Sequence, residues 1–139
     1  MDSSIIIAFD RSGDVYVADS SNRRIQVFTP EGQYLRTFSS KGAGPVTPEG
    51  QYLRTFSSKG AGPEKPCRPA GVAIDGDRVY VADSDNHRVS MFSTEGKFLK
   101  SFGGKGEARV QFQSPRFVHV SKDGFILVAD FKNGRIQVF

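Results

Sequence analysis

A segment that recurs about every 46 residues constrains the fold of this chain more than any other feature. It reads DVYVADSSNRRIQVF up to Phe28, RVYVADSDNHRVSMF up to Phe92 and FILVADFKNGRIQVF up to Phe139. The central aspartates Asp83 and Asp130 are 47 residues apart, whereas Asp19 and Asp83 are 64 residues apart. A period in this range is typical of solenoids, propellers and other repeat arrays.

An internal duplication accounts for the longer first spacing. TPEGQYLRTFSSKGAGP occupies residues 29–45 and again residues 47–63, so an 18-residue unit stands twice, and removing one copy leaves a spacing of 46. The second repeat carries the corresponding segment only once, as STEGKFLKSFGGKGEAR. Because the shorter hairpin loop closes at a lower entropic cost, Gln33–Phe38 is expected to pair with Arg24–Phe28. Gln51–Phe56 is expected to add a fifth edge strand or to stay unpaired.

Each repeat contains four short segments rich in β-branched and aromatic residues, separated by turns that contain Asp or Gly. No segment has the apolar period of a helix. VYVA and ILVA are apolar on both faces, which is typical of strands covered on both sides by neighbouring sheets. The sequence therefore predicts an all-β fold, a partial and open β-propeller of four-stranded antiparallel blades. The expected first strands are Ile5–Asp10, 70–75 and 116–121.

The repeat boundaries divide the chain into three units. Unit one covers about 5–66, including the duplicated segment 47–63, unit two covers about 67–112, and unit three covers about 113–139 without a fourth strand. Fewer than three complete blades cannot close a propeller, and repeats bury their core against neighbours. We therefore expect a fragment whose missing blades come from a parent chain, or a chain that self-associates through its end blades.

Composition limits the classes of function. The chain has 139 residues and a net charge of +4, a mild basic bias compatible with RNA or an acidic protein partner. Cys67 is the single cysteine, so no internal disulfide is possible, which favours a reducing compartment and a cytoplasmic location. The first ten residues lack the basic flank of a signal peptide. No apolar stretch has the length of a membrane span, so no membrane partner is expected.

The repeats resemble NHL repeats in their Ala-Asp-Ser, Asn-x-Arg and terminal Val-Phe elements, each followed by EG(Q/K)(Y/F)L(R/K)(T/S)F. The resemblance covers nearly the whole chain and is strongest to the C-terminal NHL domain of tripartite-motif (TRIM-NHL) ubiquitin ligases. It implies a propeller, usually of six blades, that binds RNA or protein. The third unit departs from the pattern, with Phe131 in place of Ser20 and Ser84, and with Gly134 in place of an arginine and a histidine.

The turn after each second strand carries residues that we interpret mainly as structural. The aspartates are expected to accept hydrogen bonds from the backbone amides that follow them, in Asx-type turns. The arginines are expected to fold back onto these carboxylates. The structural residues of the three turns are Asp19, Asn22, Arg24, Asp83, Asn86, Arg88, Asp130 and Asn133.

A basic rim is predicted where these turns meet the Lys-Gly loops that follow the fourth strands. The alternative interpretation of these charges is a solvated face that binds no partner. Phe131 lies between cations, an arrangement that suits a stacked RNA base. The alternative is that the ring folds over an adjacent blade. The residues predicted to form the RNA- or protein-binding rim are Arg23, His87, Phe131, Lys132, Arg135, Lys105, Arg109, Lys41 and Arg68.

No constellation in the sequence indicates catalysis. One cysteine and two histidines cannot form a RING or B-box zinc site, and His87 and His119 lack the spacing of a metal site, so no metal, cofactor or catalytic residue is expected. The predicted function is a non-catalytic binding module, the substrate- or RNA-recognition part of a TRIM-NHL-type ubiquitin ligase. The alternative is a self-associating scaffold without nucleic-acid binding. A fragment of a propeller enzyme such as an amidating lyase ranks last.

Overall fold

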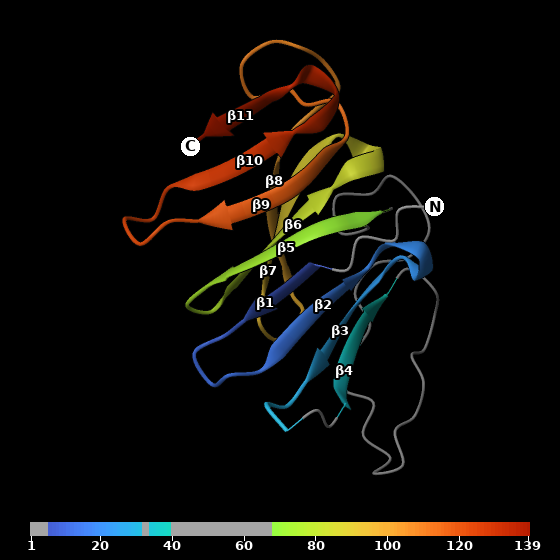
Figure 1. Cartoon of the computed structure of the whole chain (residues 1–139), viewed down its shortest axis with the longest axis vertical. Coiled ribbons are helices and arrows are strands. Elements are labelled where there is room, and N and C mark those ends of the chain that lie inside the picture. The colour runs from blue at the N-terminus through green and yellow to red at the C-terminus, as the bar shows by residue number, and fades with distance from the viewer. Residues whose placement is uncertain (1–5, 32–33, 40–67) are drawn as a thin grey trace.

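The computed structural model describes residues 6–31, 34–39 and 68–139, which form three antiparallel sheets. Figure 1 shows the sheets one after another along the long axis of the molecule. The first sheet contains β1 (Ile6–Phe9), β2 (Val15–Asp19), β3 (Arg24–Phe28) and β4 (Tyr34–Ser39). The second contains β5 (Pro69–Asp75), β6 (Arg78–Asp83), β7 (Arg88–Ser93) and β8 (Phe98–Gly103). The third contains β9 (Pro115–Val120), β10 (Ile126–Asp130) and β11 (Arg135–Val138).

Within each sheet the strands follow one another in chain order, joined by hairpins. The all-β fold and its antiparallel blades are therefore confirmed. The first strands β1, β5 and β9 lie side by side, and the later strands of each sheet extend away from them (Figure 1). The helical elements of the described residues are three short 3₁₀ turns, η1 (Ser20–Asn22), η2 (Ser84–Asn86) and η3 (Phe131–Asn133). No helix in this part of the chain is long and apolar enough to cross a membrane.

The first copy of the duplicated segment supplies the outer strand of the first sheet. β4 pairs with β3, with Ser39 opposite Arg24 and Tyr34 opposite Phe28. The expectation that the first copy pairs with Arg24–Phe28 is confirmed, with the strand displaced by one residue from the predicted range. The second copy, including Gln51–Phe56, lies outside the described residues.

The sheets pack face to face, and each has two different apolar faces. We call the face that covers the next sheet in the chain the forward face, and the opposite one the receiving face. The forward face of the first sheet and the receiving face of the second form one buried cluster, which contains Tyr16, Ala18, Ile25, Val27, Val72, Val79, Val81 and Phe92. The forward face of the second sheet and the receiving face of the third form another, which contains Ala73, Tyr80, Ala82, Val89, Met91, Phe112, Val118 and Val128.

These two clusters explain why the second strands are apolar on both sides. In β6, Val79 and Val81 belong to one cluster, and Tyr80 and Ala82 belong to the other, so alternate residues contact opposite neighbours. The same alternation leaves a free face at each end of the stack. Ile7 and Phe9 on the first sheet and Ile136 and Val138 on the third are all at least half exposed.

Gly71 allows the second and third sheets to approach closely. A Cβ atom at this position would lie 2.5 Å from the backbone oxygen of Arg116 and 3.1 Å from the Cα of Phe117. Both atoms belong to the backbone of β9, so neither can move aside without shifting the strand. The contact fixes the distance between two neighbouring first strands.

We predict that Gly71→Ala lowers the free energy of unfolding by about 1–3 kcal/mol, because the added methyl group forces the sheets apart. Gly104→Ala is the matched control, since a Cβ there meets no atom within 4 Å. Urea denaturation of both variants measures the difference. Equal midpoints for the two variants would show that the sheets do not depend on this close approach.

Candidate functional site

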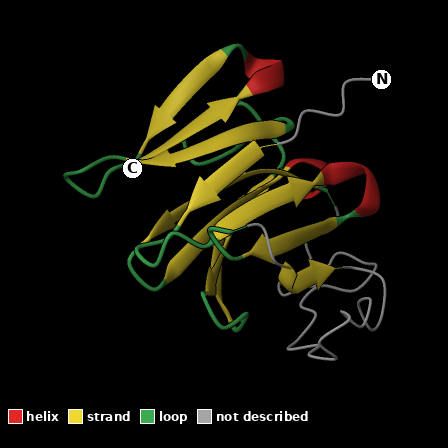
Figure 2. Ribbon diagram, turned by 60° about the horizontal axis from the view of Figure 1, so that its bottom comes forward, coloured by secondary structure: helices red, strands yellow, loops and turns green. Residues whose placement is uncertain are grey.

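The three turns that follow the second strands share one backbone geometry. Each begins after an aspartate, forms one 3₁₀ turn and ends in a left-handed residue. The left-handed positions are Arg23 (φ 55°), His87 (φ 53°) and Gly134 (φ 61°). Glycine adopts this conformation without steric cost, so the glycine of the third unit preserves the turn. Figure 2 shows the three turns in red at the same ends of their sheets.

Asp83 is a buried hydrogen-bond acceptor at the centre of the second turn. Its Oδ2 accepts from Arg88 Nε at 3.1 Å and from Asn86 Nδ2 at 2.8 Å. Its Oδ1 accepts from the backbone amide of Arg68, at 3.2 Å, in the segment that precedes β5. The carboxylate therefore joins the turn to the start of its own sheet.

Asp130 repeats this arrangement in the third turn. Its Oδ2 accepts from Arg135 Nε and from Asn133 Nδ2, both at 2.9 Å, and its Oδ1 accepts from the Gln113 amide at 2.7 Å. In the first turn, Arg24 Nε donates to Asp19 Oδ2 at 2.8 Å. The side chain of Asn22 lies outside the described residues. Each arginine thus folds back onto the carboxylate, as the sequence predicted.

The predicted Asx-type bonds are wrong. None of the three aspartate side chains caps the turn that follows it. The turn instead closes through backbone bonds such as His87 N to Ser84 O, at 3.3 Å. For Asp83 and Asp130, the bonded amide belongs to the loop between sheets. The sequence could not show this partner, because it lies 15 or 17 positions away.

Further hydrogen bonds attach the loop between β8 and β9 to the third turn. Arg135 Nη2 donates to the carbonyls of Ala108, at 2.9 Å, and Gln111, at 3.0 Å. Asn133 Nδ2 donates to Gly106 O at 2.9 Å, and the Ser114 amide donates to His87 Nδ1 at 3.1 Å. The second and third turns and this loop therefore form one continuous rim, to which Arg135 and His87 contribute the connecting bonds.

The rim carries more exposed cations than anions in the part of the chain that the structure describes. Two carboxylates lie among the cations: Asp85, whose Oδ1 is 4.0 Å from Arg68 Nη1, and the exposed Glu107. Arg23 is half-buried, and Lys41, Lys59 and Lys65 lie outside the described residues. The exposed cations of the rim are Arg68, Lys105, Arg109 and Lys132.

Phe131 stands at the edge of a pocket of about 280 Å³ on this rim. The guanidinium carbon of Arg116 lies 3.6 Å from the centre of the Phe131 ring, a cation–π contact, and 53% of the residue is exposed. Sequence reasoning missed Arg116, which follows Pro115 where the second unit has Ala70 after Pro69. The pocket, which we call the turn pocket, is lined by Ile6, Ser20, Arg68, Ala70, Ser84, Arg116, Phe117 and Phe131.

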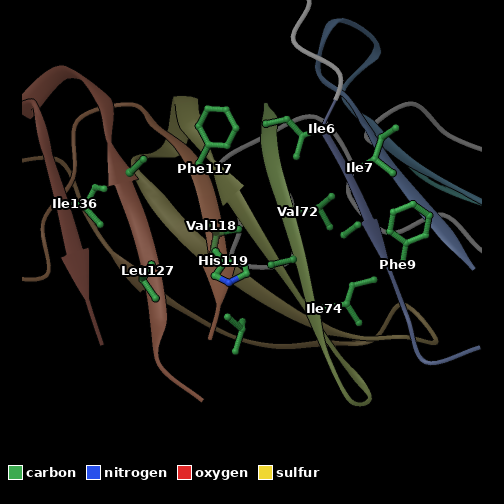
Figure 3. Close-up of a pocket in the computed structure, with 14 residues that line it drawn as sticks. Ile6, Ile7, Phe9, Val72, Ile74, Phe117, Val118, His119, Leu127 and Ile136 are labelled. Atoms are coloured by element: carbon green, nitrogen blue, oxygen red, sulfur yellow. The ribbon is translucent and has the colours of Figure 1, made fainter. Parts of the chain in front are cut away.

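A second hollow, of about 500 Å³, runs along β1, β5 and β9 and reaches β10 and β11 (Figure 3). Apart from His119, the lining residues that are labelled in Figure 3 are apolar. His119 lines this hollow, whereas His87 accepts a hydrogen bond from Ser114 in the loop before β9. Among the described residues, no group of three or more His, Cys, Asp or Glu could hold a metal ion. Cys67 lies outside this part of the chain.

Comparison with known families finds a match to the NHL repeat at residues 7–28, 67–92 and 112–139, more than half of the chain. Protein brain tumor of Drosophila melanogaster is 29% identical over 133 residues, 96% of this chain and 11% of that protein. The B-box type zinc finger protein ncl-1 of Caenorhabditis elegans is 35% identical, covering 96% of this chain and 13% of that protein. The chain thus spans about a tenth of the length of these curated relatives.

Enzymes also contain segments similar to this chain. Peptidyl-glycine alpha-amidating monooxygenase B of Xenopus laevis is 36% identical over 81 residues, 52% of this chain and 9% of that protein. Among solved structures, a streptogramin B lyase has a TM-score of 0.61 at 11% identity and covers 99% of this chain and 41% of its own. The structural similarity concerns the fold alone, which is propeller-like.

Burial raises the pKa of Asp130, but hydrogen bonds from Gln113, Asn133 and Arg135 outweigh it and hold the pKa below the ordinary value of 3.8. A carboxyl group whose pKa is lowered by folding stabilises the fold at any pH above its pKa in the unfolded state. This stabilisation is lost as the pH falls through its pKa in the folded state.

We predict that Asp130→Asn lowers the free energy of unfolding by about 1–3 kcal/mol at neutral pH. The gap from the wild type is expected to narrow below about pH 3.8.

The exposed Asp123, in the turn between β9 and β10, provides the control. Asp123→Asn is expected to match the wild type at neutral pH. Denaturant titrations across a pH series measure both variants. A gap between Asp130→Asn and the wild type that stays constant into acid would mean that the Asp130 charge does not stabilise the turn.

Proposed function

The chain belongs to the NHL-repeat family, and we propose that it is a non-catalytic module that binds single-stranded RNA on the rim formed by its turns and inter-sheet loop. The observation that supports this most is the half-exposed Phe131 ring, held by Arg116 among the exposed cations of the rim. Aromatic rings beside cations bind single-stranded nucleic acid by stacking a base and holding the neighbouring phosphates.

The charges of the rim divide into two groups. Arg24, Arg88 and Arg135 are paired with the aspartates of their own turns, so their charge is compensated within the fold. Arg68, Lys105, Arg109 and Lys132 are exposed, against the two carboxylates of Asp85 and Glu107. The exposed excess is positive, which favours a polyanion as the partner.

The rim is also ordered before any ligand arrives. Asp130 and Arg135 connect the third turn to the loop between β8 and β9 through hydrogen bonds of 2.7–3.0 Å. A binding surface that is already ordered avoids the entropic cost of ordering its loops on binding. Phe131 and Lys132 therefore present their side chains from a fixed backbone.

In the whole protein, this module would serve as the RNA- or substrate-recognition part of a TRIM-NHL-type ubiquitin ligase, acting in the cytoplasm. The relatives that span nearly the whole chain support this class over an enzyme, because the monooxygenase matches only about half of this chain.

A self-associating scaffold is the second candidate, favoured by the exposed apolar residues on the outer faces of the first and third sheets. The RNA-binding experiment below distinguishes an RNA partner from a protein partner on the same rim.

We predict that Phe131→Ser weakens binding to a labelled single-stranded random RNA pool at every salt concentration. Serine stands at the same position of the other turns, as Ser20 and Ser84, so the fold accepts it. The loss expected for one stacked base is about 1–3 kcal/mol. Fluorescence anisotropy over a salt series measures this loss. Unchanged RNA affinity with a lower melting temperature would assign Phe131 to the fold instead.

Lys132→Ala is predicted to act on the salt dependence. Loss of one phosphate contact on a single strand reduces the slope of log K against log salt by about 0.7. Lys122→Ala is the matched control, because Lys122 is also exposed but lies in the β9–β10 turn, at the other end of the third sheet. Equal slopes for the two variants would contradict a phosphate contact at Lys132. Absence of RNA binding at low salt would leave a protein as the partner of the rim.

A further inference from the structure

The turn pocket contains a hydroxyl group that the fold itself does not use. Ser84 lines the pocket and is 4% exposed, and its Oγ makes no hydrogen bond within the part of the chain that the structure describes. The equivalent Ser20, by contrast, donates through its Oγ to the carbonyl of Pro69 at 2.6 Å. The Ser84 hydroxyl therefore keeps its hydrogen-bonding capacity for a ligand in the pocket.

Two arginines with unused N–H groups line the same pocket. The Arg116 guanidinium stacks on the Phe131 ring, and it has no hydrogen bond or ion pair among the described residues. Stacking engages the face of a guanidinium and leaves the N–H groups in its plane able to donate. Arg68 Nη1 is 4.0 Å from the Asp85 carboxylate, which is longer than a hydrogen bond.

The polar lining of the turn pocket is complementary to an anion. Its two arginines differ from those of the three turns, which are bonded to their own aspartates at 2.8–3.1 Å. None of the described residues that line the pocket is acidic, and the rest of the wall is apolar, with Ile6, Ala70 and Phe117. A ligand that satisfies this lining must bring negative charge and hydrogen-bond acceptors.

A phosphomonoester has the charge and the acceptors that these donors require. It carries about −1.5 to −2 charges at pH 7 and three acceptor oxygens, which suit guanidinium groups and a hydroxyl. A phosphodiester within a strand carries a single charge and continues on both sides, so it lies along an open surface. A pocket of about 280 Å³ with a nearly buried hydroxyl in its wall instead suits a group that ends there.

From this arrangement we infer that the turn pocket binds the terminal phosphate of an RNA strand. Ser84 Oγ and the guanidinium groups of Arg68 and Arg116 donate to the phosphate oxygens. The terminal base stacks on the face of Phe131 that Arg116 leaves open. The inference rests on the proposed function and adds to it a preference for strand ends that carry a phosphate.

The repeat provides substitutions that the fold already accepts. The prolines that begin β5 and β9 occupy equivalent positions, each opposite the aspartate of its turn. Arg68 therefore corresponds to Ser114, and Arg116 corresponds to Ala70. Arg68→Ser and Arg116→Ala each introduce the residue that another unit has at the same place. Arg68 contacts Asp83 through its backbone amide, which the substitution retains.

Fluorescence anisotropy with a short oligouridine RNA, labelled at an internal base, tests the inference. The RNA is prepared with a 5′-phosphate, with a 3′-phosphate, or with hydroxyl groups at both ends. One phosphorylated form is expected to bind at least about 10-fold more tightly than the hydroxyl form at the same salt concentration. The form that gains affinity identifies the end of the strand that enters the pocket.

Arg68→Ser, Arg116→Ala and Ser84→Ala are each expected to reduce severalfold the ratio of the affinities for the phosphorylated and hydroxyl forms. Arg109→Ser is the matched control, because Arg109 is an exposed cation of the rim that does not line the pocket. This control is expected to weaken the binding of both forms equally and to leave the ratio unchanged. Melting temperatures verify that each variant is folded.

Equal affinities of the wild type for all three forms would overturn the inference while RNA binding on the rim still held. A ratio that Arg109→Ser reduces as much as the pocket variants do would also overturn it, because the gain would then reflect total charge. Absence of binding by every form at low salt would contradict the proposed function together with the inference.

Discussion

The packing of one apolar sheet face on the next is the interaction on which the rest of this structure depends. Each central strand buries alternate residues on opposite sides, as Val79 and Tyr80 do in β6, so no sheet has a core of its own. The sheets are stable only as a stack. The spacing of the stack depends on backbone contacts such as the one that Gly71 makes with Arg116. Ile7 and Phe9 of the first sheet and Ile136 and Val138 of the third lie on faces without such a neighbour among the described sheets, and they are at least half exposed.

The turn motif connects this stack to a surface. Asp83 and Asp130 each accept a backbone amide from the loop that leads into their sheet, and an arginine neutralises each carboxylate. The aspartates and arginines that recur in the repeat therefore hold the turns and loops together. Residues that the turn geometry leaves unspecified, such as Phe131 and Lys132, remain available to contact a ligand. Separating these two groups is what makes a binding rim possible on a repeated scaffold.

The sequence predicted much of this and missed what depends on distant contacts. The strand periods, the all-β class and the pairing of β4 followed from local patterns and loop length. The return of each arginine to its aspartate also followed, because the two residues are five positions apart. The loop amides on Asp83 and Asp130 did not follow, since they come from residues far along the chain. The Arg116–Phe131 contact was missed for the same reason, because it joins β9 to a turn that the sequence places 15 positions later.

The central claim is that RNA lies on the rim built by the turns and the loop between β8 and β9. Photocrosslinking of single-stranded RNA containing 4-thiouridine, followed by mass spectrometry of the crosslinked peptides, tests it most directly. The account predicts crosslinks in the peptide that contains Phe131 and Lys132 and in the segment from Lys105 to Arg116. Crosslinks concentrated in the turns at the other end of the sheets, at Asp10–Asp14 and Ser121–Phe125, would contradict it.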